Sequence, residues 1–411
     1  MSTAEIAAPP ASRYRDAFAV AEFGPLFTAY VLSLVGDVVA AVALTVLVFE
    51  RTGSPFLAGL TFTLAFVPSL LGGTLLSSLV DRLPPRRLMV GCDLLSASMV
   101  AVMAAAHAPV WALLALLVAL GLIAPVQAGS RTALLAEILP GDTFVAGRSL
   151  FRVVSQSAQV VGNATGGLLL AATSPRGALA VDAGTFVASA LLVRLGTRAR
   201  PARSEPGGRA SLLRDSLGGV RSVLAHPMLR RILVLGWLVP AFSVAPEALA
   251  APGVRELGGG GFAVGIWLAA LPAGVIVGEI ASLWLLSPAR RPRAVVPLAC
   301  WIFVPYTVFV LEPRLELAVL LLFLSGLGHG YSLGLDTLIL RYAPDGLRDR
   351  VFTVFTAGLM AIQGLGFAAA GALAELVPPH VAIVVAAGCG FATILCCAPR
   401  GGAATAASPS R

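Results

Sequence analysis

A few ionisable side chains stand inside long apolar segments, where an unpartnered charge is costly. Asp37, Glu279 and His329 are the clearest cases. A carboxylate at such a depth either makes a buried hydrogen bond or binds a proton or a cationic group. An imidazole can also titrate near neutral pH, although a histidine between two glycines is often only a satisfied polar residue. We therefore select Asp37 and Glu279 as first candidates for coupling or substrate contact, followed by His329.

Other carboxylates lie nearer the ends of apolar segments, and we expect simpler roles for them. Asp336 is expected to pair with Arg341, and Glu247 to be solvated near the outer surface. Asp93 and Asp182 are expected to make structural contacts. These four carboxylates therefore come after Asp37 and Glu279 as candidates for transport chemistry.

The apolar segment 148–173 also carries a polar face. Gln156, Gln159 and Asn163 recur at spacings of i, i+3 and i+7, which places them on one side of a helix. Such a face on a membrane helix points to a central cavity or a neighbouring helix rather than to lipid. We include these three residues among the transport candidates.

The same segment has a cluster of glycines one helical turn apart: Gly162, Gly166 and Gly167. Glycine lets another helix backbone approach closely, and it also makes a helix easier to bend. The pattern fits plain helix packing, and it fits a seal between helices that limits leakage. The two interpretations overlap, because tight packing is how a seal would work.

A short polar turn follows the second apolar segment. Its charged residues are Asp81, Arg82, Arg86 and Arg87. The arginines can bind lipid phosphates and set orientation, and Asp93 can join them in a charge network. Asp81 ends a long apolar run, so its carboxylate needs a partner, and a helix N-terminus is a natural one because its free N–H groups attract anions. We interpret this turn as a candidate gating loop.

The composition explains which elements must position these residues. The 411-residue chain is 57% hydrophobic and only 12% charged, whereas soluble domains carry about 25% charged residues. Intrinsic disorder needs the opposite composition, and five cysteines without paired spacing do not form a disulfide scaffold. Long continuous apolar runs favour helices over a β-barrel. The sequence therefore predicts an all-α polytopic membrane protein.

Twelve runs are long enough to cross a bilayer, for which roughly 20 apolar residues suffice. They cover about 17–49, 56–80, 88–106, 110–128, 148–173, 177–194, 229–250, 261–287, 294–311, 316–340, 351–375 and 381–398. We expect two bundles of six helices with a polar linker between them. The predicted boundaries are 1–194 with a tail at 1–16, the linker 195–227, the second bundle 228–398, and a tail at 399–411.

All 29 basic residues are arginines, and they are distributed unevenly. Only Arg51, Arg176, Arg255 and Arg314 fall on the connections that follow odd-numbered segments. Because basic residues mark the cytoplasmic side, we expect both termini and the linker to be cytoplasmic. The high net charge then belongs to membrane orientation and lipid contact, and no nucleic-acid partner is expected.

The two halves also match each other in sequence. Residues 83–87 and 287–291 both contain a proline followed by two arginines, at an offset of 204. The same offset relates further pairs: Pro68 with Pro272, Pro140 with Pro344, and Gly162 with Gly366. An even number of helices per unit gives a parallel repeat, related by an axis along the membrane normal.

Residues 77–93, SSLVDRLPPRRLMVGCD, resemble the signature GxLaDRxGRRR of the major facilitator superfamily. Ser77 and Pro84 stand at its two glycine positions. The stretch 162–167, GNATGG, resembles the GPxxGG element of exporters in this superfamily. LVGDVVA at 34–40, RTALLAEILPGD and VDAGTF resemble the branch that contains macrolide-efflux and enterobactin-type exporters. The Arg-x-x-Gln-Gly element of many proton-coupled members is absent.

The resemblance implies the major facilitator fold, in which two bundles rock about a site near the bilayer midplane. It also implies that Asp81 contacts the N-terminus of the helix beginning near 349–351, which would tie the halves together on the cytoplasmic side. Helix 5 would pack on helix 8 and limit leakage through the pore.

The sequence contains no GxxxxGK[ST] phosphate-binding motif, so we expect a secondary transporter without cofactor, metal or catalytic residues. The predicted function is proton-coupled export of a small hydrophobic or amphipathic compound, such as a drug, an antibiotic or a siderophore-like molecule. An importer or facilitator of the same fold is the alternative, and a membrane-embedded enzyme or a transport-dead sensor is a more distant one. We expect a monomer in the bacterial cell membrane.

The loop interpretation predicts the effect of one substitution. Asp81→Asn should lower transport while leaving membrane insertion intact, because the neutral amide loses its attraction to a helix N-terminus. Transport rate and protein level in the membrane are measured in the same preparation. Normal transport by this variant would refute a gating role for Asp81.

Overall fold

The computed structural model describes residues 11–75, 83–105, 108–139, 142–200, 226–287, 289–343 and 348–397. This part of the chain is built from helices and short turns and contains no β-strand. Helices suit such an apolar chain, because each satisfies its backbone hydrogen bonds internally and leaves no polar backbone for lipid. The predicted all-α architecture is confirmed.

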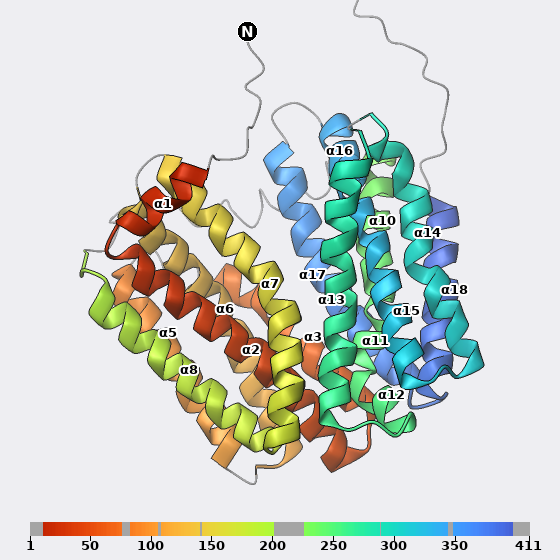
Figure 1. The fold of residues 1–411 in the computed structure, drawn as a ribbon, viewed down its shortest axis with the longest axis horizontal. Coiled ribbons are helices and arrows are strands. Elements are labelled where there is room, and N and C mark those ends of the chain that lie inside the picture. Colours follow the sequence, from red (N-terminus) through yellow and green to blue (C-terminus); the bar gives the residue numbers. More distant parts are fainter. Residues whose placement is uncertain are drawn as a thin grey trace, which may run out of the picture.

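The N-terminal half forms one bundle (Figure 1). Its helices are α1 (Ala11–Ala19), α2 (Phe23–Thr52), α3 (Pro55–Leu75), α5 (Pro85–Ala105), α6 (Val110–Ile138), α7 (Asp142–Ala172) and α8 (Pro175–Gly196). Several begin at proline, which fits the first helical turn because its missing N–H would have no partner there. The short α1 is separate from α2, so the first crossing helix begins at Phe23 instead of Ala17 as predicted.

The C-terminal half forms the second bundle (Figure 1). Its helices are α10 (Pro227–Ser243), α11 (Ala245–Ala248), α12 (Ala250–Glu256), α13 (Gly261–Leu285), α14 (Arg291–Thr307) with η1 (Val308–Leu311), α15 (Leu315–Leu327), η2 (Gly328–Gly330), α16 (Tyr331–Tyr342), α17 (Arg348–Leu373) and α18 (Pro379–Cys397). The elements α15, η2 and α16 together make one crossing.

Within the described residues, ten helical spans are long and apolar enough to cross a membrane. Two further helices lie between these spans along the chain. The apolar stretch Pro55–Ser69 of α3 is shorter, and α7 is more polar. Counting these two gives six crossings in each bundle, which is consistent with the twelve predicted. The helix α6 continues to Ile138, well past the expected end near 128, so its last turns contain residues that had been assigned to a connection.

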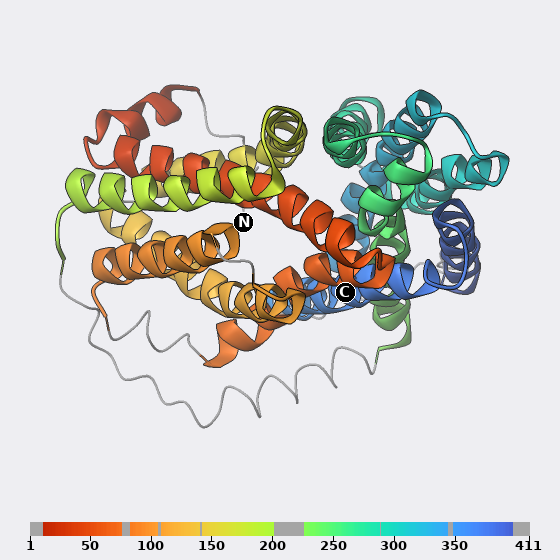
Figure 2. The same ribbon diagram turned by 90° about the horizontal axis from the view of Figure 1, so that it is seen from below.

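The two bundles meet at one end of the molecule. We name the face where α8 ends at Gly196 and α10 begins at Pro227 the linker side, and the opposite face the far side. In Figure 1 the linker side is at the top, and α7 and α3 approach α13 and α17 toward the bottom. Figure 2 shows the bundles side by side from that lower face, with the end of α2 reaching toward the second bundle.

The first contact between the bundles joins α7 to α13. A Cβ atom added to Gly167 would lie 2.8 Å from the Cα of Gly265, so the two backbones nearly touch. One turn earlier, the Nδ2 of Asn163 donates a hydrogen bond of 2.9 Å to the carbonyl of Leu268. Both contacts lie on the half of α7 nearer the far side.

The second contact joins α3 to α17 and is related to the first by the repeat. The hydroxyl of Thr63 donates to the carbonyl of Gly364 at 2.8 Å. Phe62 stacks on Phe367 at a centroid distance of 4.9 Å. At the far end, Glu375 accepts hydrogen bonds from the Ser54 hydroxyl and from the Phe56 N–H. These contacts close the interface between the bundles toward the far side.

Packing within each bundle follows the predicted offset. Gly162 of α7 packs against Val38 of α2, and Gly366 of α17 packs against Ala241 of α10. The matching glycines therefore serve matching helix pairs in the two halves. This is the arrangement that a duplicated, parallel unit of six helices produces.

The contact between the bundles predicts the effect of added bulk. Gly167→Val should lower the free energy of unfolding by about 1–3 kcal/mol, because the new side chain would press on the backbone of α13. Thermal unfolding of the purified protein in detergent measures the loss. Gly184→Val is the matched control, because nothing lies within 4 Å of a Cβ at that position. Equal losses in the two variants would contradict this packing.

Candidate functional site

A cavity of about 550 Å³ lies mainly within the second bundle and reaches α7 of the first. Its lining comes from α10, α11, α13, η2, α16 and α17, together with Gln159 of α7. Pockets for drug-sized ligands range over roughly 300–1,000 Å³. The size of this cavity and its reach to both bundles make it the best candidate substrate site.

Three carboxylates line this central cavity from three different helices: Glu247 of α11, Glu279 of α13 and Asp336 of α16. The hydroxyl of Ser332 lies 3.4 Å from Glu279 and donates weakly to it, and Asp336 is close enough to Glu279 for electrostatic repulsion. Glu247 was expected in solvent at the outer surface, and it instead faces the cavity. The short helix α11 turns it inward.

The expected pair between Asp336 and Arg341 does not form among the described residues. The two residues are five positions apart on α16, and helix neighbours face each other at three or four positions. The Asp336 side chain is exposed and lines the cavity. Its charge is therefore available to the cavity instead of being neutralised by its own helix.

Apolar and aromatic side chains make up the rest of the central cavity. Leu271, Val275 and Ile276 of α13 form one wall, and Tyr331 and Phe355 face it from α16 and α17. No lysine or arginine occurs among its described lining residues. A compound in this space would meet apolar walls and carboxylates.

His329 lies at a break in a crossing helix, where η2 interrupts α15 and α16. Short 3₁₀ segments inside a helix often mark a functional or strained position. Gly330 is needed there, because a Cβ would lie 2.8 Å from the carbonyl of Gly278 on α13. The Nδ1 atom of His329 is buried without a hydrogen-bond partner in the described part of the chain, and the residue lines the central cavity.

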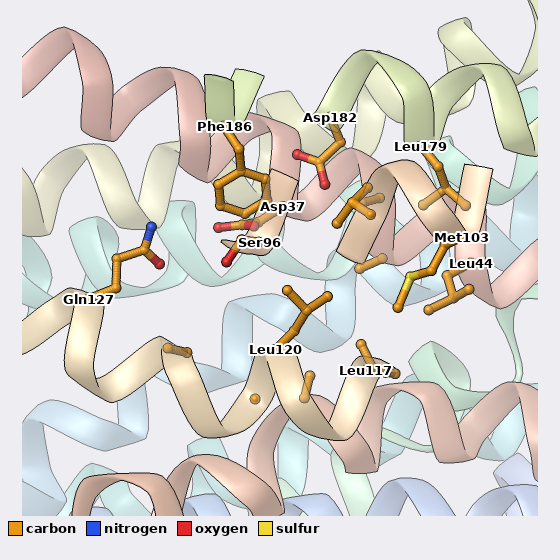
Figure 3. A pocket seen from close by; sticks show the side chains of 16 residues that line it. Asp37, Leu44, Ser96, Met103, Leu117, Leu120, Gln127, Leu179, Asp182 and Phe186 are labelled. Atoms are coloured by element: carbon orange, nitrogen blue, oxygen red, sulfur yellow. The ribbon is translucent and has the colours of Figure 1, made fainter. Parts of the chain in front are cut away.

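A second cavity of about 210 Å³ lies inside the first bundle, among α2, α3, α5, α6 and α8. Figure 3 shows Asp37, Asp182, Ser96 and Gln127 on its polar wall, with leucines and Met103 opposite. Asp37 has solvent-accessible surface and borders this space. The structure thus places Asp37 beside a mostly apolar cavity of the first bundle, away from the central cavity.

The polar wall of this second cavity, which we call the N-terminal cavity, continues into a group of charged and polar side chains. We call this group the N-terminal network. Asp93 is fully buried and accepts hydrogen bonds from Gln127 and, at 2.7 Å, from the Ser189 hydroxyl. Asp93 thus sits inside the bundle with α6 and α8, and none of its described hydrogen bonds comes from an arginine of the predicted gating loop. Asp182 accepts from Thr185 at 3.1 Å, and it interacts electrostatically with Asp37.

Arg131 completes the N-terminal network, and sequence reasoning missed it. Its guanidinium lies 4.0 Å over the ring of Tyr30 and interacts electrostatically with Asp37 and Asp93. We had counted Arg131 with the cytoplasmic arginines, because the predicted helix ended near residue 128. The apolar residues Leu134, Leu135 and Ile138 that follow it were the signal that the helix continues.

The other predicted site residues are spread over several environments. Gln159 lines the central cavity, Asn163 binds α13, and the Gln156 side chain lies outside the described part. Gly162 and Gly166 pack on α2, so of the three glycines only Gly167 contacts α13.

The described part of the predicted gating loop is polar and partly exposed. The Arg86 guanidinium donates to the carbonyl of Arg194, and Arg87 is exposed. Asp81 and Arg82 lie outside the described residues. The predicted contact of Asp81 with the start of α17 therefore stays a prediction.

An ion pair fastens the linker side of the first bundle. Arg200 donates two hydrogen bonds of 2.9 Å to Glu22, and the Arg198 N–H donates a third at 2.8 Å. The hydrogen bond from Arg200, opposed by partial burial, lowers the pKa of Glu22 below its ordinary value. This pair joins the chain beyond α8 to the start of α2.

The sequence model of the Major Facilitator Superfamily matches residues 26–330. The chain is 26% identical over 363 residues to the multidrug efflux pump Tap of Mycolicibacterium fortuitum, covering 84% of this chain and 87% of that protein. It is 27% identical over 389 residues to the enterobactin exporter EntS of Shigella boydii serotype 4 (strain Sb227), covering 90% and 89%.

Solved structures agree on the fold. The nucleoside transporter NupG has a TM-score of 0.74 at 13% identity, over 91% of this chain and 98% of that one. A D-xylose-proton symporter has a TM-score of 0.65 at 13% identity, over 94% and 98%. At such low identity these structures speak for the architecture alone.

The N-terminal network predicts a graded loss of stability. Asp93→Leu should lower the free energy of unfolding by about 3 kcal/mol, because it leaves two donors without an acceptor and weakens the charge balance of Arg131. Asp93→Asn should cost less, since its amide oxygen still accepts a hydrogen bond. Thermal unfolding in detergent measures both, with Glu256→Gln on the exposed far side as the control. Equal unfolding temperatures for all three variants would contradict the network.

Proposed function

This chain belongs to the Major Facilitator Superfamily, and from that premise we propose that it is a proton-coupled exporter of small amphipathic compounds. Membership in this superfamily makes the chain a membrane transport protein and not an enzyme. The observation that carries the proposal is the central cavity of about 550 Å³, which combines apolar walls with carboxylates. Two bundles that rock about such a site can expose it to one side of the membrane at a time.

The direction of transport is proposed from orientation and from the relatives. The concentration of arginines on the linker side favours a cytoplasmic location for that face. The far-side contacts of α7 with α13 and of α3 with α17 then close the cavity toward the outside. A cavity shut on the outside suits capture of a compound from the cytoplasm or the inner leaflet. Similarity to two exporters over most of the chain supports export.

We assign proton coupling to the N-terminal network. Asp37 and Asp93 both interact with the guanidinium of Arg131, and Asp182 lies close enough to Asp37 to repel its charge. A proton on Asp37 would remove excess negative charge from a region that lipid and protein shield from water. The adjacent cavity of about 210 Å³ is polar on this side and large enough to admit water.

A contiguous set of contacts links the proposed proton site to the central cavity. Asp37 lies on α2 beside Val38, which packs on Gly162 of α7. The same α7 contacts α13 through Gly167, and α13 carries Glu279. A change in packing at Asp37 can therefore reach the cavity through two helix contacts. Of the α7 glycines, Gly167 acts in this scheme as the seal that limits leakage.

A flux experiment tests direction and coupling together. Drug-sensitivity panels with erythromycin, tetracycline, chloramphenicol and ethidium select a compound to which expression of the protein gives resistance. Everted membrane vesicles with an acidic interior should accumulate that compound, because protons leave the vesicle as the compound enters. Dissipating the pH gradient should reduce accumulation to the level of vesicles without the protein.

Asp37→Asn is the matching variant, because its amide has the same shape and cannot carry the proton. It should abolish gradient-driven accumulation while downhill movement of the compound continues. Glu256→Gln removes a carboxylate outside both cavities and should behave as the unmodified protein. Proton-driven movement of the compound out of everted vesicles would instead identify an importer. Full gradient-driven accumulation by Asp37→Asn would exclude Asp37 as the proton-coupling residue.

A further inference from the structure

We propose that the central cavity selects lipophilic organic cations, which Glu247, Glu279 and Asp336 hold by their negative charge. This inference rests on the proposed transport function and names the substrate class of the same site. It does not depend on the direction of transport or on the coupling ion. Neutral and anionic compounds of the same size should bind more weakly.

The charges of the side chains that line the central cavity are not balanced. The described lining of the central cavity carries three carboxylates and no lysine or arginine. In the first bundle, by contrast, Arg131 places a guanidinium near the carboxylates of Asp37 and Asp93. Like charges that face one space repel each other, and the described lining of the central cavity has no guanidinium like that of Arg131 to offset this repulsion. A bound organic cation would supply the positive charge.

The carboxylates of the central cavity also have free hydrogen-bonding capacity. Glu279 receives one long hydrogen bond, from Ser332 at 3.4 Å. Glu247 and Asp336 make no hydrogen bond or ion pair with any other described residue. An ionised carboxylate accepts about four hydrogen bonds, so most of the acceptor positions in the cavity are available to a ligand. Asp93, by comparison, accepts a hydrogen bond on each of its two carboxylate oxygens.

The apolar and aromatic walls of the central cavity indicate the chemistry of the uncharged part of the ligand. Leu271, Val275 and Ile276 give the cavity an apolar wall, and the rings of Tyr331 and Phe355 line it as well. Aromatic faces attract cations, and more strongly when water is excluded. A small hydrated ion would gain nothing from these walls. The combination fits a cation that carries bulky apolar or aromatic groups.

The main competing interpretation is that the three carboxylates only carry protons. In that case the charge of a transported compound would not matter, and a neutral substitution would leave its affinity unchanged. An anionic compound is disfavoured in either case, because it would meet like charge without a compensating group. Binding measured apart from transport separates the two interpretations.

The probe is tetraphenylphosphonium, a permanent cation with four aromatic rings, and its neutral counterpart is triphenylphosphine oxide. Binding of radiolabelled tetraphenylphosphonium to the purified full-length protein is measured by scintillation proximity, and unlabelled compounds compete. We expect the cation to compete at least tenfold better than the neutral oxide. Equal competition by the two would overturn the proposal.

The variants Glu247→Gln, Glu279→Gln and Asp336→Asn test the site itself. Each should weaken tetraphenylphosphonium binding by about tenfold and leave binding of the neutral oxide within about twofold. Glu256→Gln makes the same change of charge outside the central cavity and should bind both compounds normally. Unchanged cation affinity in all three cavity variants would overturn the proposal, because the cation would then bind elsewhere.

The outcomes also separate this inference from the proposed function. Charge-selective binding that depends on the three carboxylates, in a protein that moves nothing in vesicles, supports the inference and contradicts transport. Export of a neutral compound together with charge-independent binding supports transport and contradicts the inference. The competition comparison uses only the unmodified protein, so it remains decisive if a variant fails to fold.

Discussion

The arrangement of the whole molecule depends on the close approach of α7 and α13 at Gly167 and Gly265. Neither residue has a side chain, so the two bundles meet backbone to backbone at this point. Without a hydrophobic driving force between helices in lipid, such contacts rely on dispersion and on occasional hydrogen bonds like that of Asn163. Closing the far side in this way leaves the space farther along the same helices for the central cavity.

The two bundles divide the buried charge differently, although they derive from one repeated unit. In the first, a guanidinium and several hydrogen-bond donors surround the carboxylates, and the polar groups satisfy one another. In the second, the carboxylates face open space and have few partners. A satisfied network holds its geometry, whereas an unsatisfied one can bind something. In the proposed mechanism, this difference between the halves assigns protons to the first group and the ligand to the second.

The sequence was sufficient to predict the membrane-spanning helices, because an apolar run of bilayer length can form few other structures. It predicted that the glycines of α7 allow close helix packing, but not that Gly162 and Gly166 pack on α2 while Gly167 packs on α13. It failed at Arg131 and Glu247, for a common reason. Each lies near the end of an apolar run, where hydropathy cannot distinguish a side chain in solvent from one turned inward. That choice depends on how far the helix continues and on which neighbours pack there, as at α6 and α11.

Alternating access requires that the far-side contacts also break, which limits how strong they can be. The described contacts are individually weak: they include glycine backbones, the stacking of Phe62 on Phe367 and hydrogen bonds such as those of Thr63 and Glu375. A hydrogen bond contributes only about 1 kcal/mol net, and an aromatic pair about as much. Each of these contacts can therefore break at a cost that differential ligand binding can offset. A tighter interface would give a more stable protein, and one unable to release its cargo on the other side.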